Sequence, residues 1–261
     1  MKKILAVVLG LIFSLAASQA MAFSLAGGYT GPIKVKFSNY EMPSLPFALG
    51  EGQANGTEDL WGILKVTTIL SDDGNDTILW SAGPTEELTG MFYDLDLNAA
   101  RMIGPLVEVD FVGGLLDIYL DATPDFTAVG GPGVRCGLGC YPTVTDGGLF
   151  LSMVFTPGVH GDGTTLHGLI DSMTLPITGH GSGFLAITGG SHQYMFGPSA
   201  HQQNDVCTPG APGCIPVGYG WPLKSEDPMR MTAVVPEPTT VLLLGAGLVG
   251  LGLWGRKRMV K

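Results

Sequence analysis

Basic side chains are scarce in this sequence: its 261 residues contain 13 Lys and Arg against 23 Asp and Glu. Six of the basic residues, but only one of the acidic ones, lie in the first 22 and last 27 residues. The segment between them therefore has 7 bases and 22 acids, a net charge of −15. Such a surface repels nucleic acid and anionic lipid, and it is compatible with divalent cations and neutral polymers as partners.

The sequence also lacks the compact motifs of common enzyme classes. It contains no G-x-S-x-G and no H-E-x-x-H, and no phosphate loop or dinucleotide fingerprint follows a predicted strand. Ser, His and Asp do occur in its C-terminal half, for example Asp162, His167 and Asp171, but polar loops supply such residues by chance. We therefore expect a non-enzymatic protein, and a secreted hydrolase is the weakest alternative.

Amphipathic helical patterns are missing as well. β-branched and aromatic residues instead fill short segments that are separated by turns rich in the 40 Gly and 18 Pro. This pattern predicts an all-β fold, an antiparallel β-sandwich of jelly-roll type, for one domain at residues 23–234. The expected strands are residues 33–37, 60–70, 77–81, 88–97, 149–155, 166–170, 173–177, 183–188, 192–196 and 229–235.

The clearest local pattern is at residues 106–121, where apolar and acidic residues alternate on both sides of Gly113-Gly114. Two glycines can supply the positive φ angles of a two-residue hairpin turn. This predicts a hairpin whose apolar residues meet on one face and whose Asp110 lies opposite Asp117. Two like charges in that position are unfavourable unless something neutralises them. The pair is either a solvated outer face or a cation site.

A second acidic group lies in the turn at residues 71–76, where Asp72, Asp73, Asn75 and Asp76 surround Gly74. Carboxylate and carbonyl oxygens around a glycine are what Ca²⁺ requires, but the ordered ligand spacing and distal Glu of an EF-hand loop are absent. A polar hairpin turn explains these residues equally well. These two acidic groups are the Ca²⁺ candidates, and we expect no other cofactor.

Cysteines are few and occur in two close pairs, Cys136 with Cys140 and Cys207 with Cys214. An even number in an exported chain indicates disulfides, and three connectivities are possible. Two local loops are the simplest, because the Gly and Pro residues within them favour tight turns. A zinc site formed by all four cysteines is the alternative.

The N-terminus has the three parts of a secretory signal peptide. A basic start at Lys2 and Lys3 precedes an apolar stretch at residues 4–17, and Ala20 and Ala22 form a small-x-small cleavage site. Residues 1–22 are thus expected to form a signal helix that signal peptidase removes, which makes the protein an exported one.

The C-terminus also has three parts, at residues 235–261. Pro236, Glu237 and Pro238 come first, an apolar stretch at residues 241–255 follows, and a basic cluster ends the chain. The apolar stretch would be about 22 Å long as a helix, short for a hydrocarbon core of roughly 30 Å, so it predicts a transient transmembrane anchor. The basic residues that stop it are Arg256, Lys257 and Arg258.

This tail resembles the PEP-CTERM sorting signal, in which Pro-Glu-Pro, an apolar helix and an Arg-rich end are recognised by an exosortase. The resemblance implies an inner-membrane intermediate that is processed and then found at the cell surface or outside the cell. An ordinary C-terminal anchor is the alternative.

Residues 58–62, 88–93 and 114–121 look similar, more patchily, to flocculation-associated PEP-CTERM proteins. These are exported proteins linked to exopolysaccharide and floc formation, and the similarity transfers no catalytic residue. It implies a structural or adhesive role in a biofilm or floc, with extracellular polysaccharide as partner. The alternative is a secreted carbohydrate- or calcium-binding module without an adhesive role.

Overall fold

The structure is a computed structural model that describes residues 23–44, 49–160, 163–171, 178–208, 214, 220–226 and 228–234. The predicted signal peptide and its cleavage site, the C-terminal motif with its apolar helix and basic end, and the strand predicted at 173–177 lie outside these residues. Within them, no helix is long and apolar enough to cross a membrane.

Every strand is antiparallel to its neighbours, as the sequence predicts. The described residues also contain two short 3₁₀ turns, η2 and η3. The turns are η2 (Ala26–Gly28) and η3 (Gln193–Met195). The strands are β1 (Gly31–Pro43), β2 (Gly50–Glu51), β3 (Leu60–Ser71), β4 (Ile78–Ser81), β5 (Glu87–Ile103), β6 (Leu106–Asp121), β7 (Gly148–Thr156), β8 (Leu166–Asp171), β9 (Thr178–Gly189), β10 (Phe196–Cys207), β11 (Leu223–Glu226) and β12 (Met229–Ala233).

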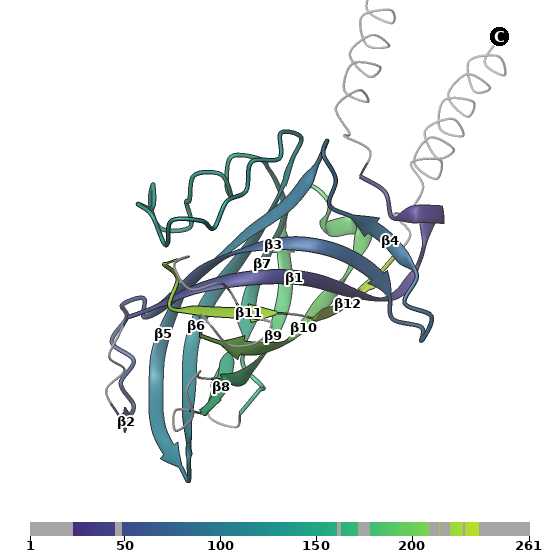
Figure 1. The fold of residues 1–261 in the computed structure, drawn as a ribbon. Helices are drawn as coiled ribbons and strands as arrows, with labels where there is room; N and C mark the ends of the chain where they lie inside the picture. Colours follow the sequence, from purple (N-terminus) through teal and green to yellow (C-terminus); the bar gives the residue numbers. More distant parts are fainter. Residues whose placement is uncertain are drawn as a thin grey trace, which may run out of the picture.

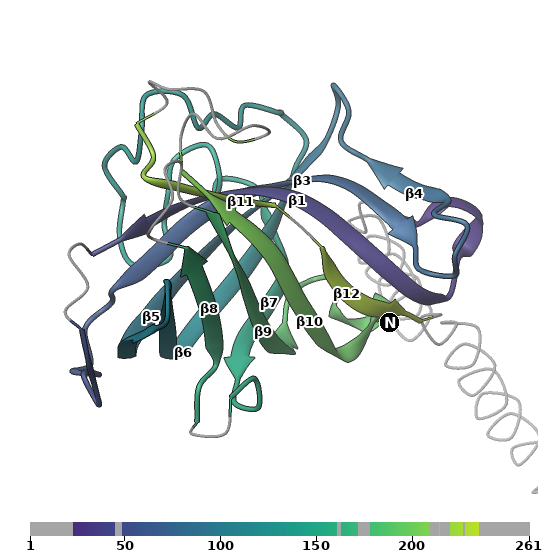
Figure 2. The ribbon, with the colours of Figure 1, turned by 60° about the horizontal axis from the view of Figure 1, so that its bottom comes forward.

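The strands form one hydrogen-bonded sheet that closes on itself, not the two sheets of the predicted sandwich (Figures 1 and 2). One edge of β1 pairs with β3, and its other edge pairs with β12 and then β11. From there the sheet continues through β10, β9, β7 with β8, β6 and β5 back to β3. Because the sheet is closed, few strand edges are left unpaired. Closure depends on pairing between strands that are far apart in the sequence, which the alternation of apolar and polar residues within one strand does not specify.

The predicted hairpin at residues 106–121 is wrong, because these residues form the single strand β6. The turn lies before it, at Gly104 and Pro105, where Ile103 pairs with Leu106 across the β5–β6 hairpin. Gly113 and Gly114 do have positive φ angles, 72° and 97°. They occur where β6 changes partner from β8 to β7. A Cβ on Gly114 would lie 2.5 Å from Leu95 Cδ2, so the bend requires glycine.

The main hydrophobic core fills the inside of the closed sheet. Inward residues alternate with outward ones along each strand, as Ile33, Val35 and Phe37 do on β1. At one end, Phe23 packs edge-on against Phe150 with ring centroids 4.7 Å apart. This apolar end differs from the opposite end of the interior, where polar side chains replace the apolar ones.

A second, smaller core lies on the outer face of β3 and β5. Residues 122–147, which join β6 to β7, pack over this face together with Trp221, which is 1% exposed. Glu87 fixes the start of the loop, because its buried carboxylate accepts hydrogen bonds from the N–H groups of Asp125 and Phe126. The loop therefore adds a packed layer to the domain.

Both disulfides are local, Cys136 to Cys140 and Cys207 to Cys214. The simplest of the three connectivities is confirmed, and the four-cysteine zinc site is wrong because all four sulfurs are in disulfides. The first bond lies within the segment that joins β6 to β7, and the second links the end of β10 to Cys214, so neither bond joins two strands.

Replacing Cys136 and Cys140 together by serine should lower stability only modestly. The chain-entropy model gives roughly 2 kcal/mol for so short a loop. For a domain of this size that corresponds to a melting temperature lower by about 4–8 °C. Thermal unfolding followed by circular dichroism measures it, and a loss of the folded signal at 25 °C would show that the disulfide holds more than its loop.

Candidate functional site

The inward face of β1 changes from apolar to polar halfway along the strand. Asn39 and Glu41 continue the same alternation as Ile33, Val35 and Phe37, and both are buried. On β10, Gln202 and Asn204 occupy the equivalent inward positions beside them. Two strands far apart in sequence thus bring a carboxyl group and three amides to one end of the interior.

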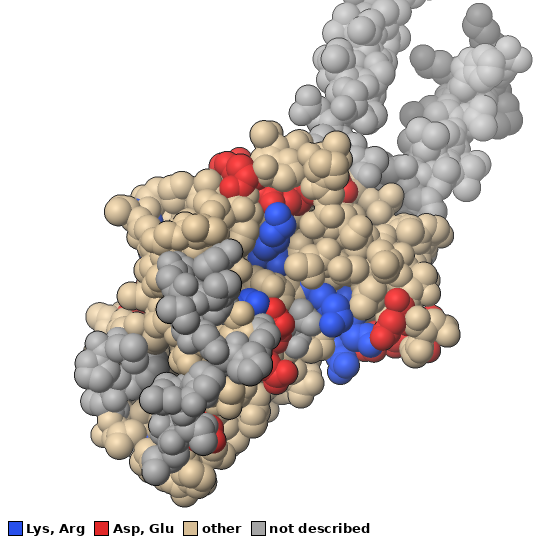
Figure 3. Space-filling model, in the orientation of Figure 1, with Lys and Arg blue, Asp and Glu red and all other residues tan. Residues whose placement is uncertain are grey.

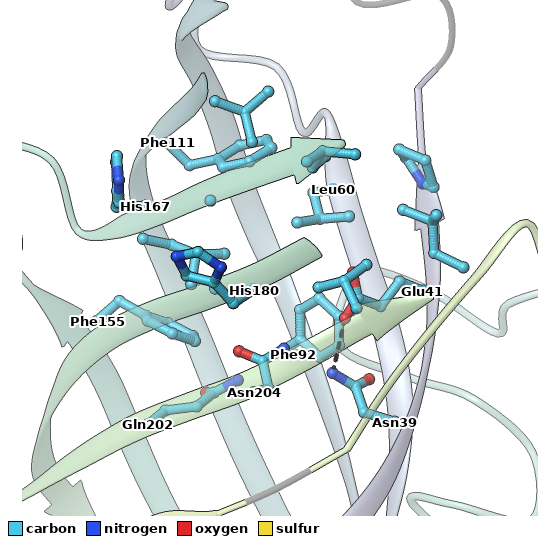
Figure 4. A pocket seen from close by; sticks show the side chains of 18 residues that line it. Asn39, Glu41, Leu60, Phe92, Phe111, Phe155, His167, His180, Gln202 and Asn204 are labelled. Atoms are coloured by element: carbon cyan, nitrogen blue, oxygen red, sulfur yellow. Dashed lines mark hydrogen bonds between the residues drawn. The ribbon is translucent and has the colours of Figure 1, made fainter. Parts of the chain in front are cut away.

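These polar groups line a cavity together with apolar side chains and two histidines, His167 and His180 (Figure 4). Phe92, Phe111 and Phe155 form much of the apolar wall, and Gly181 leaves space beside Asn204. The cavity volume is about 50 Å³, enough for about three to five water molecules at 10–15 Å³ each. Pockets for drug-sized ligands are usually at least about 300 Å³, so this interior does not accommodate a sugar.

Glu41 is the one carboxyl group among the described residues that line the cavity. Ser225 Oγ and Asn39 Nδ2 donate hydrogen bonds to its Oε1, at 2.5 and 3.1 Å. Burial nevertheless raises the pKa of Glu41 from 4.5 to about 7, and the hydrogen bond from Ser225 only partly offsets this effect. Asn39 Oδ1 and Asn204 Oδ1 are buried and accept no hydrogen bond from the described residues, so enclosed water is their natural partner.

A cluster of ionisable residues lies on the outer face of the neighbouring wall. The register of three strands places Arg101 of β5 opposite Glu108 of β6, and Asp110 of β6 opposite His167 of β8. Since Val109 and Phe111 line the cavity, Glu108 and Asp110 point outward from it. Both are nonetheless buried, Asp110 at 0% and Glu108 at 6% exposure.

The cluster is held together by charge-assisted hydrogen bonds. Arg101 donates to both carboxylates, through Nε to Glu108 and through an Nη to Asp110. His167 Nδ1 lies 2.7 Å from Asp110 Oδ1, and its Nε2 lies 3.9 Å from Glu108 Oε1. His160, from the segment after β7, adds its Nδ1 at 3.4 Å from Asp110 Oδ2. Two imidazoles and two carboxylates therefore converge.

The acidic turn predicted as a Ca²⁺ candidate has basic partners. Lys34 Nζ lies 3.4 Å from Asp72 and 2.6 Å from Asp76, and Arg230 Nε lies 3.2 Å from Asp72. Asp73 accepts hydrogen bonds within the turn from Ser71 Oγ and the N–H of Asn75. This arrangement favours the polar hairpin turn, because the lysine and arginine already neutralise the charge that a cation would need.

The predicted pairing of Asp110 with Asp117 is wrong, because both lie on the single strand β6, seven residues apart. Asp117 accepts a hydrogen bond from the Tyr93 hydroxyl at 2.9 Å instead. The structure thus separates the two carboxylates and gives Asp110 other neighbours.

Basic and acidic side chains lie beside one another on the visible surface. Figure 3 shows the blue and red groups in contact in several small areas of this face, without a broad region of one sign. The ion pairs in the described residues include those of Lys34 with Asp72 and Asp76, and that of Lys224 with Glu226. Local pairing therefore neutralises some of the acidic groups, whereas the excess of acids over bases is unchanged.

Fold and site together define a disulfide-bonded, all-β protein with a closed sheet and buried polar groups. A family model for the PEP-CTERM protein-sorting motif matches residues 234–257, so the chain carries this motif. The motif implies export, sorting at the membrane and recognition by an exosortase. Neither a curated protein nor a solved structure matches the chain significantly.

Sequence reasoning missed the inward polar residues and most of the cluster. The alternation that identified residues 33–37 continues through Asn39 and Glu41, and polar residues at inward positions were the available signal. No strand was predicted at the position of β10, because residues 197–222 are rich in Pro and Gly. Glu108 lies on β6 and His167 on β8, and nothing in the sequence of either strand indicates that the two strands are neighbours.

Proposed function

We propose that the protein is exported, processed by an exosortase at its C-terminal motif, and then acts outside the cell without catalysing a reaction. Its role there is structural or adhesive, within a matrix rich in exopolysaccharide. The sorting motif supports the first part, and the patchy resemblance to flocculation-associated proteins supports the second.

One observation carries the proposal: the last described strand ends at Ala233, immediately before the matched motif begins. The last strand, β12, pairs with β1 on one edge and β10 on the other. Val234, the first residue matched by the family model, donates its N–H to Met195 O at 2.9 Å. Cleavage after this point removes none of the strands that the structure describes, so the processed domain can keep its fold.

The intact mass of the protein from cell-surface and medium fractions tests processing. We expect a chain that begins near Phe23 and ends near Pro238, having lost the apolar tail. A Glu237→Ala variant, and wild-type protein in a host without the exosortase, should both keep residues 239–261. Released wild-type protein that still carries residues 241–261 would contradict exosortase processing.

The matrix role is tested separately, by comparing floc or biofilm formation and the polysaccharide-bound protein fraction in cells with and without this gene. We expect the processed protein in the polysaccharide fraction and weaker aggregation without it. Because the interior cavity is too small for a sugar, contact with polysaccharide would use the outer surface. Retention on polysaccharide resin with unchanged aggregation would favour the non-adhesive binding module.

A further inference from the structure

We propose that Glu108, Asp110, His160 and His167 bind a divalent transition-metal ion, for which Zn²⁺ is the best match. One ligand atom from each of the four residues lies within 4.8 Å of all the others. The site is independent of exosortase processing and of any matrix role, because it lies in the folded domain.

The first argument is charge. The two carboxylates are almost fully buried, and among the described residues Arg101 is the only Lys or Arg that forms an ion pair with them. With neutral imidazoles the group has a net charge of −1. An uncompensated buried charge is strongly unfavourable, so the cluster requires another positive charge. A bound cation supplies it, and so does a proton on a histidine.

The second argument is geometry, and it favours the metal over the proton. In a tetrahedral zinc site with bonds of about 2.0–2.1 Å, the ligand atoms lie about 3.3 Å apart. His160 Nδ1 is 3.4 Å from Asp110 Oδ2, and His167 Nε2 is 3.9 Å from Glu108 Oε1. These separations are slightly longer than a hydrogen bond and leave room for an ion between the groups.

The third argument is the orientation of His167. Its Nδ1 donates to Asp110 Oδ1 at 2.7 Å, which leaves the Nε2 lone pair directed toward the side of Glu108. A carboxylate that orients a histidine in this way is a standard feature of metal sites. Arg101 holds the two carboxylates from the other side. The cluster is therefore positioned before any ion arrives.

The ligand types decide the class of metal. Two imidazoles with carboxylates suit Zn²⁺ and neighbouring transition metals, whereas Ca²⁺ prefers an all-oxygen set. The side chain of His160 is 44% exposed, which gives an ion access to the otherwise buried group. Asp110 and His160 are far apart in the sequence, so an ion bound by both would connect the segment after β7 to the sheet.

The test uses the full chain in detergent solution, stripped with a chelator and titrated with ZnCl₂ by calorimetry, with bound metal counted by mass spectrometry. We expect one zinc per chain and a rise in melting temperature with added zinc. His160→Ala should weaken binding about tenfold or more. Because His160 is partly exposed, the melting temperature of this variant should be close to that of the metal-free wild type.

His201→Ala is the matched control, because His201 is a partly exposed histidine on β10 that stacks on Phe184. It should bind zinc as the wild type does, and CaCl₂ should give no comparable binding. Three results would overturn the proposal. They are no saturable zinc binding, the same zinc affinity in His160→Ala as in wild type, or the same loss of zinc affinity in His160→Ala and His201→Ala.

Discussion

Replacing Glu41 by glutamine should make the protein more stable at pH 8 and leave it almost unchanged near pH 4. Burial raises the pKa of Glu41 from 4.5 to about 7, so the folded state binds this proton more tightly than the unfolded state does. The stability that the neutral form provides is fully present below about pH 4.5 and is lost as pH rises through about 7. At 1.36 kcal/mol per pKa unit, the loss is about 3 kcal/mol.

Glutamine should avoid this loss because its side-chain oxygen can still accept the hydrogen bonds from Ser225 and Asn39. The measurement is the free energy of unfolding in urea between pH 4 and 8 for both proteins, and the difference curve isolates Glu41. Glu226→Gln, at a carboxylate that is about half exposed, is the matched control. Parallel curves for wild type and Glu41→Gln would show that the cavity hydrates the carboxylate well enough to remove the shift.

Replacing Trp221 by alanine should produce the second large effect, a loss of about 3–5 kcal/mol. The indole is 1% exposed and contacts Trp61 edge-on, with ring centroids 5.7 Å apart. Its Nε1 donates a hydrogen bond to the Ala128 carbonyl at 2.9 Å, and that carbonyl would lose this partner as well. The melting temperature should fall by about 10 °C, at about 2–4 °C per kcal/mol.

Limited proteolysis shows whether this loss is local to the outer core. Cleavage within residues 122–147 should become faster in Trp221→Ala, because the loop packs on the indole. Val134→Ala is the control: Val134 lies in the same loop but is 89% exposed, so its truncation should change little. If Trp221→Ala melted within about 1 °C of wild type, the packing of the loop on the outer core would contribute no measurable stability.

Strand positions were largely predictable because alternation is a local property. The expected segments 60–70 and 149–155 coincide with β3 and β7 to within about a residue at each end, and 88–97 lies within the longer β5. The prediction failed where a polar residue pointed inward. The strand predicted at residues 33–37 continues in the structure to Pro43, and its inward Asn39 and Glu41, which the prediction left out, line the cavity.

The failure at Gly113 and Gly114 has a different physical cause. Two consecutive glycines are compatible with a hairpin turn and equally with a bend inside a strand, since both need positive φ. Which one forms depends on the strands that pair with β6. Strand β8 pairs with β6 before the bend and β7 pairs with it after the bend, so β6 continues as one strand. Asp110 and Asp117 were predicted to lie opposite each other across that turn, so this prediction is wrong for the same reason.

The sequence by itself determined the sorting motif and the all-β class and favoured the local disulfide pairs, because each depends on residues close together in the chain. Only the tertiary structure decided that the sheet closes, which strands are neighbours, and hence that Glu41 meets Asn204 and that Asp110 meets His167. Register between distant strands is set by the packing of the whole interior, and no single segment encodes it.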